Sequence, residues 1–180
     1  MKFATLIKKV EKELRHVLSI INEKDVNSFV DLILNSKVIF LTGQGRSGLV
    51  AQAFAMRLVH LGFESHYVGE ATTPNIEKGD LLIAISGSGK TKITNDIISA
   101  AKKTKAKCCL ITADKKSARK VDLVVEIRAK TKFGKQKSIE PMGSLFEQSC
   151  LLYLDVVVLI LMDRIGKDES YLMMRHTKME

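Results

Sequence analysis

Two apolar segments that each run directly into a short glycine-rich turn constrain the fold of this chain most. Residues 38–42 lead into the turn at 43–48 (GQGRSG), and residues 81–85 lead into the turn at 86–91 (SGSGKT). A helical pattern follows each turn. In a parallel sheet, the turns at the carboxyl ends of neighbouring strands meet in one crevice, so we expect the two turns to form a single binding site.

The second turn has the composition of a phosphate-binding loop. Hydroxyl groups of Ser86, Ser88 and Thr91 alternate with Gly87 and Gly89, and the glycines allow the backbone to approach a ligand closely. The helix predicted over 91–105 begins with unpaired N–H groups, which favour an anion, and Lys90 adds a positive charge. The GSGKT string resembles the end of a nucleotide P-loop, but that motif requires glycine where this chain has Ala84. The turn therefore fits one phosphomonoester better than a triphosphate.

The first turn, which contains Gly45, Arg46 and Ser47, matches the GxGxxG pattern of dinucleotide-binding proteins. Such proteins also place an acidic residue about 20 residues further on, at the end of the next strand. Glu70 lies near that distance, but in a turn beyond the predicted strand. A dinucleotide site also needs no second hydroxyl-rich turn on a neighbouring strand. The two turns together favour a phosphorylated small molecule, and a dinucleotide stays open as the alternative.

The remaining pattern predicts an α/β fold, a three-layer α/β/α sandwich around a five-stranded parallel sheet. Near-continuous runs of Val, Ile and Leu alternate with helical segments, which is typical of parallel strands covered on both faces. The further strands are expected at 65–68, 80–86, 106–112 and 121–127, and the intervening helices at 48–61, 91–105 and, in short form, 115–120. A long helix is expected over 144–165 and a short one over 168–176.

Two amphipathic helices are predicted before the first strand, at 3–21 and 26–35, from apolar residues at helical spacing. We expect residues 1–36 to pack on the domain or on a partner subunit, and residues 37–180 to form one globular unit. The second half of the long helix, residues 150–162, is apolar almost all round. Since a domain of 180 residues can hardly surround such a helix, a homo-oligomer is expected.

The composition fits a soluble cytoplasmic protein without a bound metal. Three cysteines form no disulfide or zinc pattern, and four histidines show no ligand spacing. The N-terminus is charged and amphipathic, unlike a signal peptide, and the apolar run at 150–162 contains Asp155 and is too short to span a bilayer. We expect no membrane association and no cofactor.

The net charge of +9 raises the question of a nucleic-acid partner. Basic residues gather at 102–107, 115–120 and 128–137. The sequence shows no recognition helix, zinc ligands or interleaved aromatic residues, so nucleic acid is not the favoured partner. A solvated basic surface that attracts anionic substrates is the favoured interpretation.

The two turns and several further segments resemble those of a known family. The pair of turns is similar to those of the sugar isomerase (SIS) domain family, which binds phosphosugars at both. The segments FAMRLVHLGF (54–63), VGEATTP (68–74), EPMGSLFEQ (140–148) and the closing Arg175-His176 are similar to its 6-phospho-3-hexuloisomerase branch. The resemblance covers the chain from about Ile39 onward. Lys90 and the basic segment at 128–137 depart from the family pattern.

The resemblance implies an isomerase of the ribulose monophosphate pathway, in formaldehyde fixation or pentose supply. The implied reaction interconverts D-arabino-3-hexulose 6-phosphate and D-fructose 6-phosphate through an enediol, without a metal. The implied assembly is a homotetramer. The substrate-binding residues are expected in both turns, at Gly45, Arg46, Ser47, Ser86, Gly87, Ser88, Gly89, Lys90 and Thr91.

The resemblance makes Glu147 the catalytic base, although a lone helix glutamate is more often an ordinary surface residue. Arg46 is placed to stabilise the enediol oxygens, and a surface or interface cation is an equal alternative. His60 ends the helix that begins at the first turn, about 20 Å from that turn, so it could act only on the site of a neighbouring subunit. The resemblance makes His176 a further candidate for such a contact, while a helix C-terminal cation remains the alternative for His60.

Two other function classes stay open. One is a regulatory phosphosugar sensor on the same fold, although such regulators usually carry a DNA-binding domain and only about 36 residues precede the first strand here. The other is a dinucleotide-dependent enzyme, which the second turn and the position of Glu70 disfavour.

Overall fold

The computed structural model describes residues 2–118 and 121–178, so Arg119 and Lys120 of the short helix expected at 115–120 lie outside the described residues. Its centre is a parallel sheet of five strands in the order β2-β1-β3-β4-β5. The strands are β1 (Val38–Gly43), β2 (Glu64–Tyr67), β3 (Leu81–Ile85), β4 (Lys107–Thr112) and β5 (Leu123–Glu126). The predicted α/β/α sandwich is confirmed.

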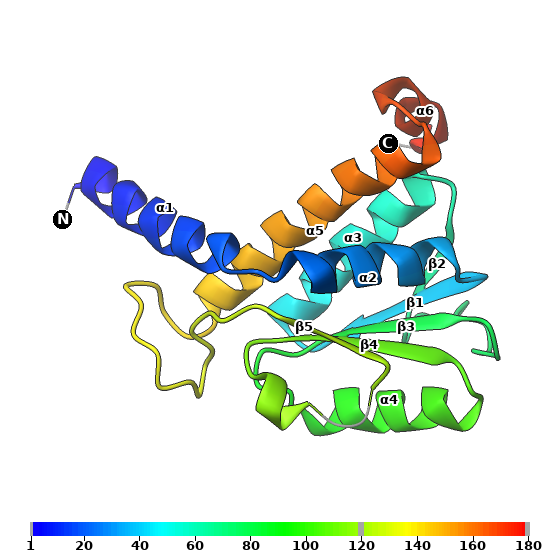
Figure 1. Ribbon diagram of the computed structural model, residues 1–180, viewed down its shortest axis with the longest axis horizontal. Helices are drawn as coiled ribbons and strands as arrows, with labels where there is room; N and C mark the ends of the chain where they lie inside the picture. Colours follow the sequence, from blue (N-terminus) through cyan, green and yellow to red (C-terminus); the bar gives the residue numbers. More distant parts are fainter. Residues whose placement is uncertain (1, 119–120, 179–180) are drawn as a thin grey trace.

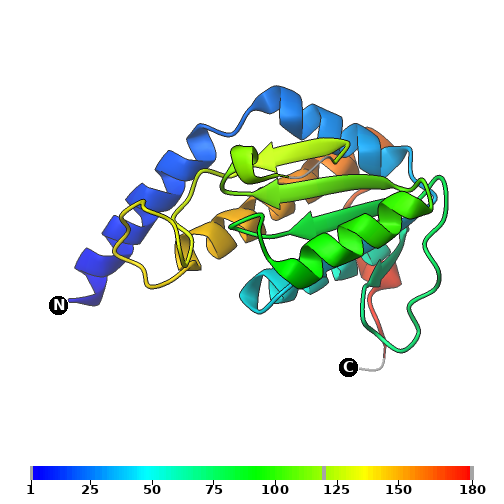
Figure 2. The same cartoon turned by 90° about the horizontal axis from the view of Figure 1, so that it is seen from below.

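Helices cover the two faces of the sheet unequally (Figure 1). One face carries α2 (Glu23–Leu34), α3 (Arg46–His60) and the long α5 (Ser144–Ile165), while α4 (Lys92–Lys103) lies on the opposite face. A short 3₁₀ turn, η1 (Lys115–Ser117), joins β4 to β5, and α6 (Glu169–Arg175) follows α5. Figure 2, seen from below the view of Figure 1, shows α4 in front of the sheet. From β1 the chain crosses to β2 at one side of the sheet, and from β3 it crosses to β4 at the other side. The direction of the crossovers therefore changes between β1 and β3.

The strand residues divide between two cores because successive side chains point to opposite faces. In β3, Leu81, Ile83 and Ile85 join the large core under α2, α3 and α5. Leu82 and Ala84 join the smaller core under α4. Every one of these five side chains is fully buried, which explains why the strand reads as an unbroken apolar run.

The two N-terminal helices differ in how they pack. α2 buries Phe29, Val30 and Ile33 completely in the large core. α1 (Phe3–Ser19) crosses the start of α5 and then projects from the domain, and Val17 is its single buried residue (Figure 1). α2 thus shares the core of the sheet. The domain boundary expected near residue 36 stays a prediction.

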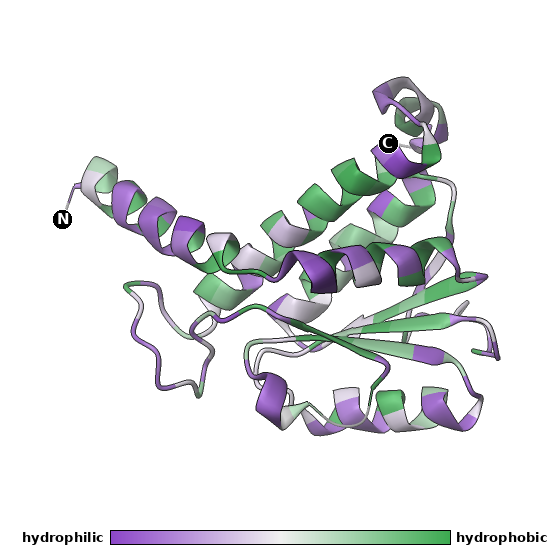
Figure 3. Ribbon diagram, viewed as in Figure 1, coloured by the Kyte–Doolittle hydropathy of each residue, from purple (hydrophilic) through white to green (hydrophobic). Residues whose placement is uncertain are grey.

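α5 is the most apolar helix and is not fully buried. By length and composition alone it could cross a membrane, but half of its most apolar stretch is buried inside the domain, and a single helix of this kind is weak evidence for a membrane span. Much of the α5 ribbon is coloured as hydrophobic in Figure 3. Four of its apolar residues are partly or largely exposed: Leu151, Leu152, Val156 and Leu159. The neighbouring α3 exposes Leu49, Met56 and Val59. We call these exposed apolar side chains of α3 and α5 the apolar face; contiguous exposed apolar surface often marks an interaction site.

The predicted helices agree with the structure to within a few residues at each end. The long helix begins and ends at Ser144 and Ile165, as expected. The helix after the first turn starts at Arg46 rather than at position 48, because Gly45 already has a non-helical backbone and acts as the N-cap. The helix after the second turn starts at Lys92, with Thr91 as its N-cap.

Candidate functional site

The candidate site lies at the carboxyl edge of the sheet, where β1 and β3 pair side by side. Gly43 at the end of β1 pairs with Ile85 at the end of β3, so the two glycine-rich turns leave the sheet next to each other. The crossovers diverge between these two strands, and open α/β sheets bind ligands in the crevice that this divergence creates. The expected convergence of the turns is therefore observed.

The first turn brings β1 and α3 into unusually close contact. A Cβ at Gly43 would lie 2.8 Å from the Ser47 backbone, and one at Gly48 would lie 2.8 Å from both the Gly43 carbonyl oxygen and the Tyr67 hydroxyl. Gly45 has a φ of 59°, a conformation that side-chain-bearing residues rarely adopt. Ser47 is buried in the first turn of α3, two residues after the N-cap Gly45.

The second turn is tied together by its own hydroxyls. Ser86 Oγ lies 3.1 Å from Thr91 Oγ1, and the Lys90 N–H donates to Ser88 Oγ at 3.2 Å. The Gly89 N–H donates to the Ser86 carbonyl at 3.0 Å. Ser86 is only 4% exposed, so its hydroxyl is held at the base of the turn, while Lys90 is exposed at its tip. The first N–H groups of α4 point out of the helix at the same place and favour an anion.

An open hollow of 1090 Å³ lies beside the second turn. One wall is the turn itself, and the other is the basic segment that follows β5. Gly87 forms part of the floor, where an added Cβ would lie 3.0 Å from Thr131 Cγ2. The charged residues of the lining are four cations and two acids: Lys90, Lys116, Arg128, Lys135, Asp114 and Glu126. The excess of positive charge suits an anionic ligand.

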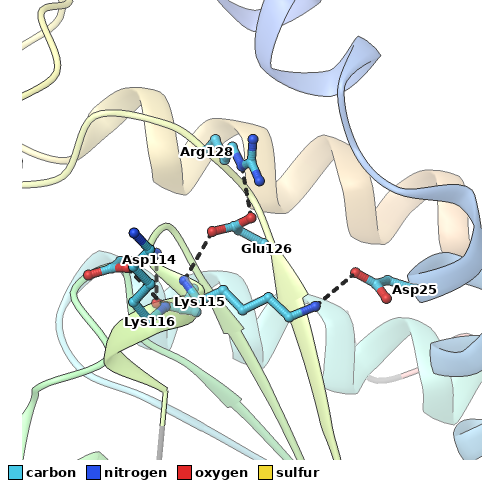
Figure 4. Close-up of polar contacts among 7 residues, drawn as sticks. Asp25, Asp114, Lys115, Lys116, Glu126 and Arg128 are labelled. Atoms are coloured by element: carbon cyan, nitrogen blue, oxygen red, sulfur yellow. Dashed lines mark hydrogen bonds and ion pairs between the residues drawn. The ribbon is translucent and has the colours of Figure 1, made fainter.

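The rim of the hollow is held by a network of charged residues (Figure 4). Glu126 accepts hydrogen bonds from Arg128 Nε at 2.8 Å and from the Lys115 N–H at 3.1 Å. Partial burial raises the pKa of Glu126, but these hydrogen bonds outweigh burial and hold the pKa below its usual range. The Lys115 ammonium also lies 3.8 Å from a carboxylate oxygen of Asp25 on α2. The turn after β4 and the segment after β5 are thus joined to each other and to α2.

Glu147 lies in the first turn of α5 and forms an ion pair with Arg46 of the first turn, the Arg46 Nε donating to Glu147 Oε2. The Glu147 side chain is 16% exposed, whereas that of Arg46 is 60% exposed. Glu147 is therefore not an ordinary surface glutamate. The preceding residue, Phe146, packs on the second turn, since a Cβ at Gly87 would lie 3.1 Å from its ring. The first turn of α5 consequently contacts both glycine-rich turns.

His60 and His176 lie together, at the other end of α3 from Arg46. Their ring centroids are 5.3 Å apart, and His60 is 6% exposed. From Arg46 to His60 the helix rises by about 21 Å, too far for either histidine to reach the Arg46–Glu147 pair of the same chain. The sequence indicated the distance for His60 but not that the two histidines would be neighbours.

The described residues contain no cluster of three or more His, Cys, Asp and Glu side chains that could hold a metal ion. The three cysteines are free and buried. Burial chiefly, with the nearby Asp122 carboxylate, raises the pKa of the Cys108 thiol to about 11, which disfavours the nucleophilic thiolate. Glu70, the acid that a dinucleotide site would require, is exposed in the turn after β2.

Sequence reasoning missed the far wall of the hollow. Thr131, Phe133 and Gln136 line it, and Arg128 is fixed there by Glu126. The basic composition of residues 128–137 was the one available signal, and it gave no indication that this segment faces the second turn. The ion pair of Arg46 with Glu147 was also not predicted, because the partners are 101 residues apart.

Comparison with known proteins places these features in a family. The family model described as the SIS domain matches residues 32–152. A Bacillus subtilis protein named 3-hexulose-6-phosphate isomerase is 38% identical over the whole of both chains. A Methanocaldococcus jannaschii protein of the same name is 41% identical over 84% of this chain and 82% of its own.

Among solved structures, a hypothetical protein from Methanococcus jannaschii superposes with a TM-score of 0.84 at 36% identity, covering 98% of this chain and 99% of its own. Its crystal structure was described as inferring a molecular function of 3-hexulose-6-phosphate isomerase. A second hypothetical protein superposes with a TM-score of 0.90 at 33% identity, covering 98% of this chain and 96% of its own.

Proposed function

This chain belongs to the SIS domain family, and on that premise we propose that it interconverts D-arabino-3-hexulose 6-phosphate and D-fructose 6-phosphate. The structural observation that carries the proposal is the position of Glu147. A largely buried carboxylate stands on a helix turn that packs against the hydroxyl-rich second turn, and it is paired with an arginine of the first turn. This arrangement provides a base beside a phosphate-binding loop.

The phosphate is proposed to bind at the second turn and the start of α4. Ser86, Ser88, Thr91 and, from the first turn, Ser47 are proposed to supply hydroxyl donors and Lys90 a positive charge, with the backbone of Gly45, Gly87 and Gly89 proposed to lie next to the phosphate. Hydrogen bonds to a charged phosphate are stronger than those between neutral groups. The excess of cations around the hollow attracts the dianionic substrate.

Glu147 is proposed to move one proton between C2 and C3. The ion pair with Arg46 requires the carboxylate to be ionised, which is the form that accepts a proton. Glu147 takes the proton from C2 of the 3-hexulose phosphate, the C–H electron pair forms the C2–C3 double bond, and the π electron pair of the C3 carbonyl moves to its oxygen. The proton of the C2 hydroxyl passes to that oxygen as the C2 carbonyl forms, and the electron pair of the C2–C3 double bond takes the first proton back from Glu147 at C3.

Arg46 is proposed to stabilise the negative charge that develops on the enediol oxygens. Its side chain is 60% exposed and its Nε is the atom bound to Glu147, so its terminal nitrogens can reach a substrate without breaking the pair. The 3-hexulose phosphate is an open chain, because the phosphate on O6 blocks the hydroxyl that would close a five-membered ring. No residue is needed for ring opening in this direction.

We further propose that the protein assembles into a homo-oligomer, a tetramer, through the apolar face of α3 and α5. Met56, Val156 and Leu159 on this face are each about half exposed or more, and covering them would remove a large apolar area from water. His60 and His176 then serve the site of a neighbouring subunit, since they cannot reach their own. The proposed setting is the cytoplasmic ribulose monophosphate pathway.

The direct test is a coupled assay that detects fructose 6-phosphate formed from 3-hexulose 6-phosphate by the purified protein. Turnover without added metal or nucleotide is the expected result. A protein that gains thermal stability with fructose 6-phosphate but shows no turnover would instead be a phosphosugar sensor, and stabilisation by NAD alone would indicate the dinucleotide alternative.

A further inference from the structure

α1 is fastened to the segment that leads into α5 by one side chain. Glu13 accepts a hydrogen bond from Ser138 Oγ at 2.5 Å through one carboxylate oxygen and from the Ile139 N–H at 3.1 Å through the other. Within the part of the chain that the structure describes, no other side-chain hydrogen bond joins α1 to the rest of the domain, since the Ser19 hydroxyl bonds to its own helix. Both oxygens of one carboxylate are thus used to hold a segment more than 120 residues away.

The contacts continue from this segment into α5. The Glu140 N–H donates to Ser138 Oγ at 2.9 Å, so the serine hydroxyl links Glu13 to the next residues. The Glu140 side chain in turn accepts a hydrogen bond from the Gln148 side chain. Gln148 is the neighbour of Glu147 on α5. A continuous set of hydrogen bonds therefore runs from α1 to the helix turn that bears the proposed base.

Little else holds this segment in place. Ile139 is 46% exposed and Met142 is 56% exposed, so the segment has no apolar anchor at these positions. Lys130 Nζ, on the basic segment that follows β5, donates to the Glu140 carbonyl at 3.0 Å. Met142 also has a φ of 57°, an unfavourable conformation for a residue with a side chain. A segment with a strained backbone and few apolar contacts depends on its polar contacts for a single conformation.

We propose that Glu13 is a positioning residue for the isomerase reaction. By fixing residues 138–140, it sets the position of the first turn of α5 and hence of the Glu147 carboxylate relative to the bound sugar. It touches neither substrate nor Glu147. The inference rests on the proposed function. It gives α1 a role in catalysis in addition to the packing of its buried residue Val17.

The test compares Glu13→Ala with Glu11→Ala, which removes the same charge from an exposed position of the same helix. Glu13→Ala is expected to lower kcat about 10- to 100-fold, the range for a small displacement of a catalytic group, while KM stays within about threefold because the phosphate anchor is elsewhere. Glu11→Ala is expected to behave as the wild type. Glu13→Gln, whose amide oxygen can still accept the Ile139 N–H, is expected to recover most of kcat.

A double-mutant cycle with Ser138→Ala identifies the path of the effect. If Glu13 acts through Ser138, the double variant loses no more of kcat than the larger of the two single losses. Additive losses would overturn the proposed path. Equal kcat in Glu13→Ala and Glu11→Ala, or a loss of kcat that Glu13→Gln does not recover, would overturn the proposal as a whole.

Amide hydrogen exchange separates this inference from the proposed function. In the wild type the N–H groups of Ile139 and Glu140 are hydrogen-bonded, so they should exchange slowly, and Glu13→Ala should speed the exchange of both and of the first turn of α5. Unchanged exchange rates would refute the coupling even in an active enzyme. An inactive wild type with this exchange pattern would refute the isomerase function and leave the coupling intact.

Discussion

Removal of the hydroxyl groups of the second turn tests the proposed phosphate anchor. Ser86 is 4% exposed, its Oγ lies 3.1 Å from Thr91 Oγ1, and Ser88 Oγ accepts the Lys90 N–H, so these hydroxyls are fixed before a ligand binds. Each hydrogen bond to a charged group contributes about 1.5–3 kcal/mol. Since 1.4 kcal/mol corresponds to about a factor of ten in affinity, Ser86→Ala and Ser88→Ala should each raise KM for fructose 6-phosphate by about 10- to 150-fold.

The cost to the fold should be smaller. Ser86→Ala removes one hydroxyl pair within the turn, about 1 kcal/mol, which lowers Tm by about 2–4 °C in a domain of this size. Ser99→Ala is the matched control, because the Ser99 hydroxyl bonds only to the Asn95 carbonyl within α4. It should lower Tm by a similar amount and leave KM unchanged. A double variant Ser86→Ala/Ser88→Ala whose KM stays within about twofold of the wild type would refute the anchor.

Three further predictions follow from single contacts. Gly48→Ala should lower the free energy of unfolding by about 1–3 kcal/mol, because the new Cβ would lie 2.8 Å from the Gly43 carbonyl oxygen and from the Tyr67 hydroxyl. Urea denaturation measures this loss, and an unchanged midpoint would contradict it. Glu126→Gln should cost about 1 kcal/mol or less at pH 7. The difference from wild type should shrink as the pH falls through the lowered pKa of Glu126, since a carboxylate with a lowered pKa stabilises the fold only while it is ionised; a difference that does not change between neutral and acidic pH would contradict this. Mixing inactive His60→Asn and Glu147→Gln subunits during refolding should restore part of the activity, because a hybrid oligomer regains one site with both residues intact. An absence of recovery would exclude a role for His60 across subunits.

The sheet and its helices could be predicted from the sequence because their signals are local. The apolar run of β3 is contained within about ten residues of sequence. The same holds for each of the glycine-rich turns that follow β1 and β3. The phosphate-binding character of Ser86, Ser88 and Thr91 was readable for the same reason, although their roles in binding stay predictions.

The contacts that complete the site could not be predicted, because they join residues far apart in the chain. Arg46 meets Glu147, Glu13 meets Ser138 and His60 meets His176 only after α1, α3, α5 and α6 have packed. A lone glutamate on a helix has the same local pattern whether it lies in solvent, as Glu11 does, or binds two donors, as Glu13 does. The sequence therefore suggested Glu147 only through resemblance.

The most direct measurement of the central claim is solvent deuterium exchange catalysed by Glu147→Gln. With fructose 6-phosphate in deuterated water, the wild-type enzyme should place deuterium at C3 through the enediol, which NMR detects. Glutamine keeps the shape and hydrogen-bonding reach of the side chain but cannot take the proton, so exchange and kcat should both fall about 10²–10⁴-fold while the affinity for fructose 6-phosphate is unchanged. Exchange and turnover by Glu147→Gln at rates near those of the wild type would contradict the assignment of Glu147 as the base.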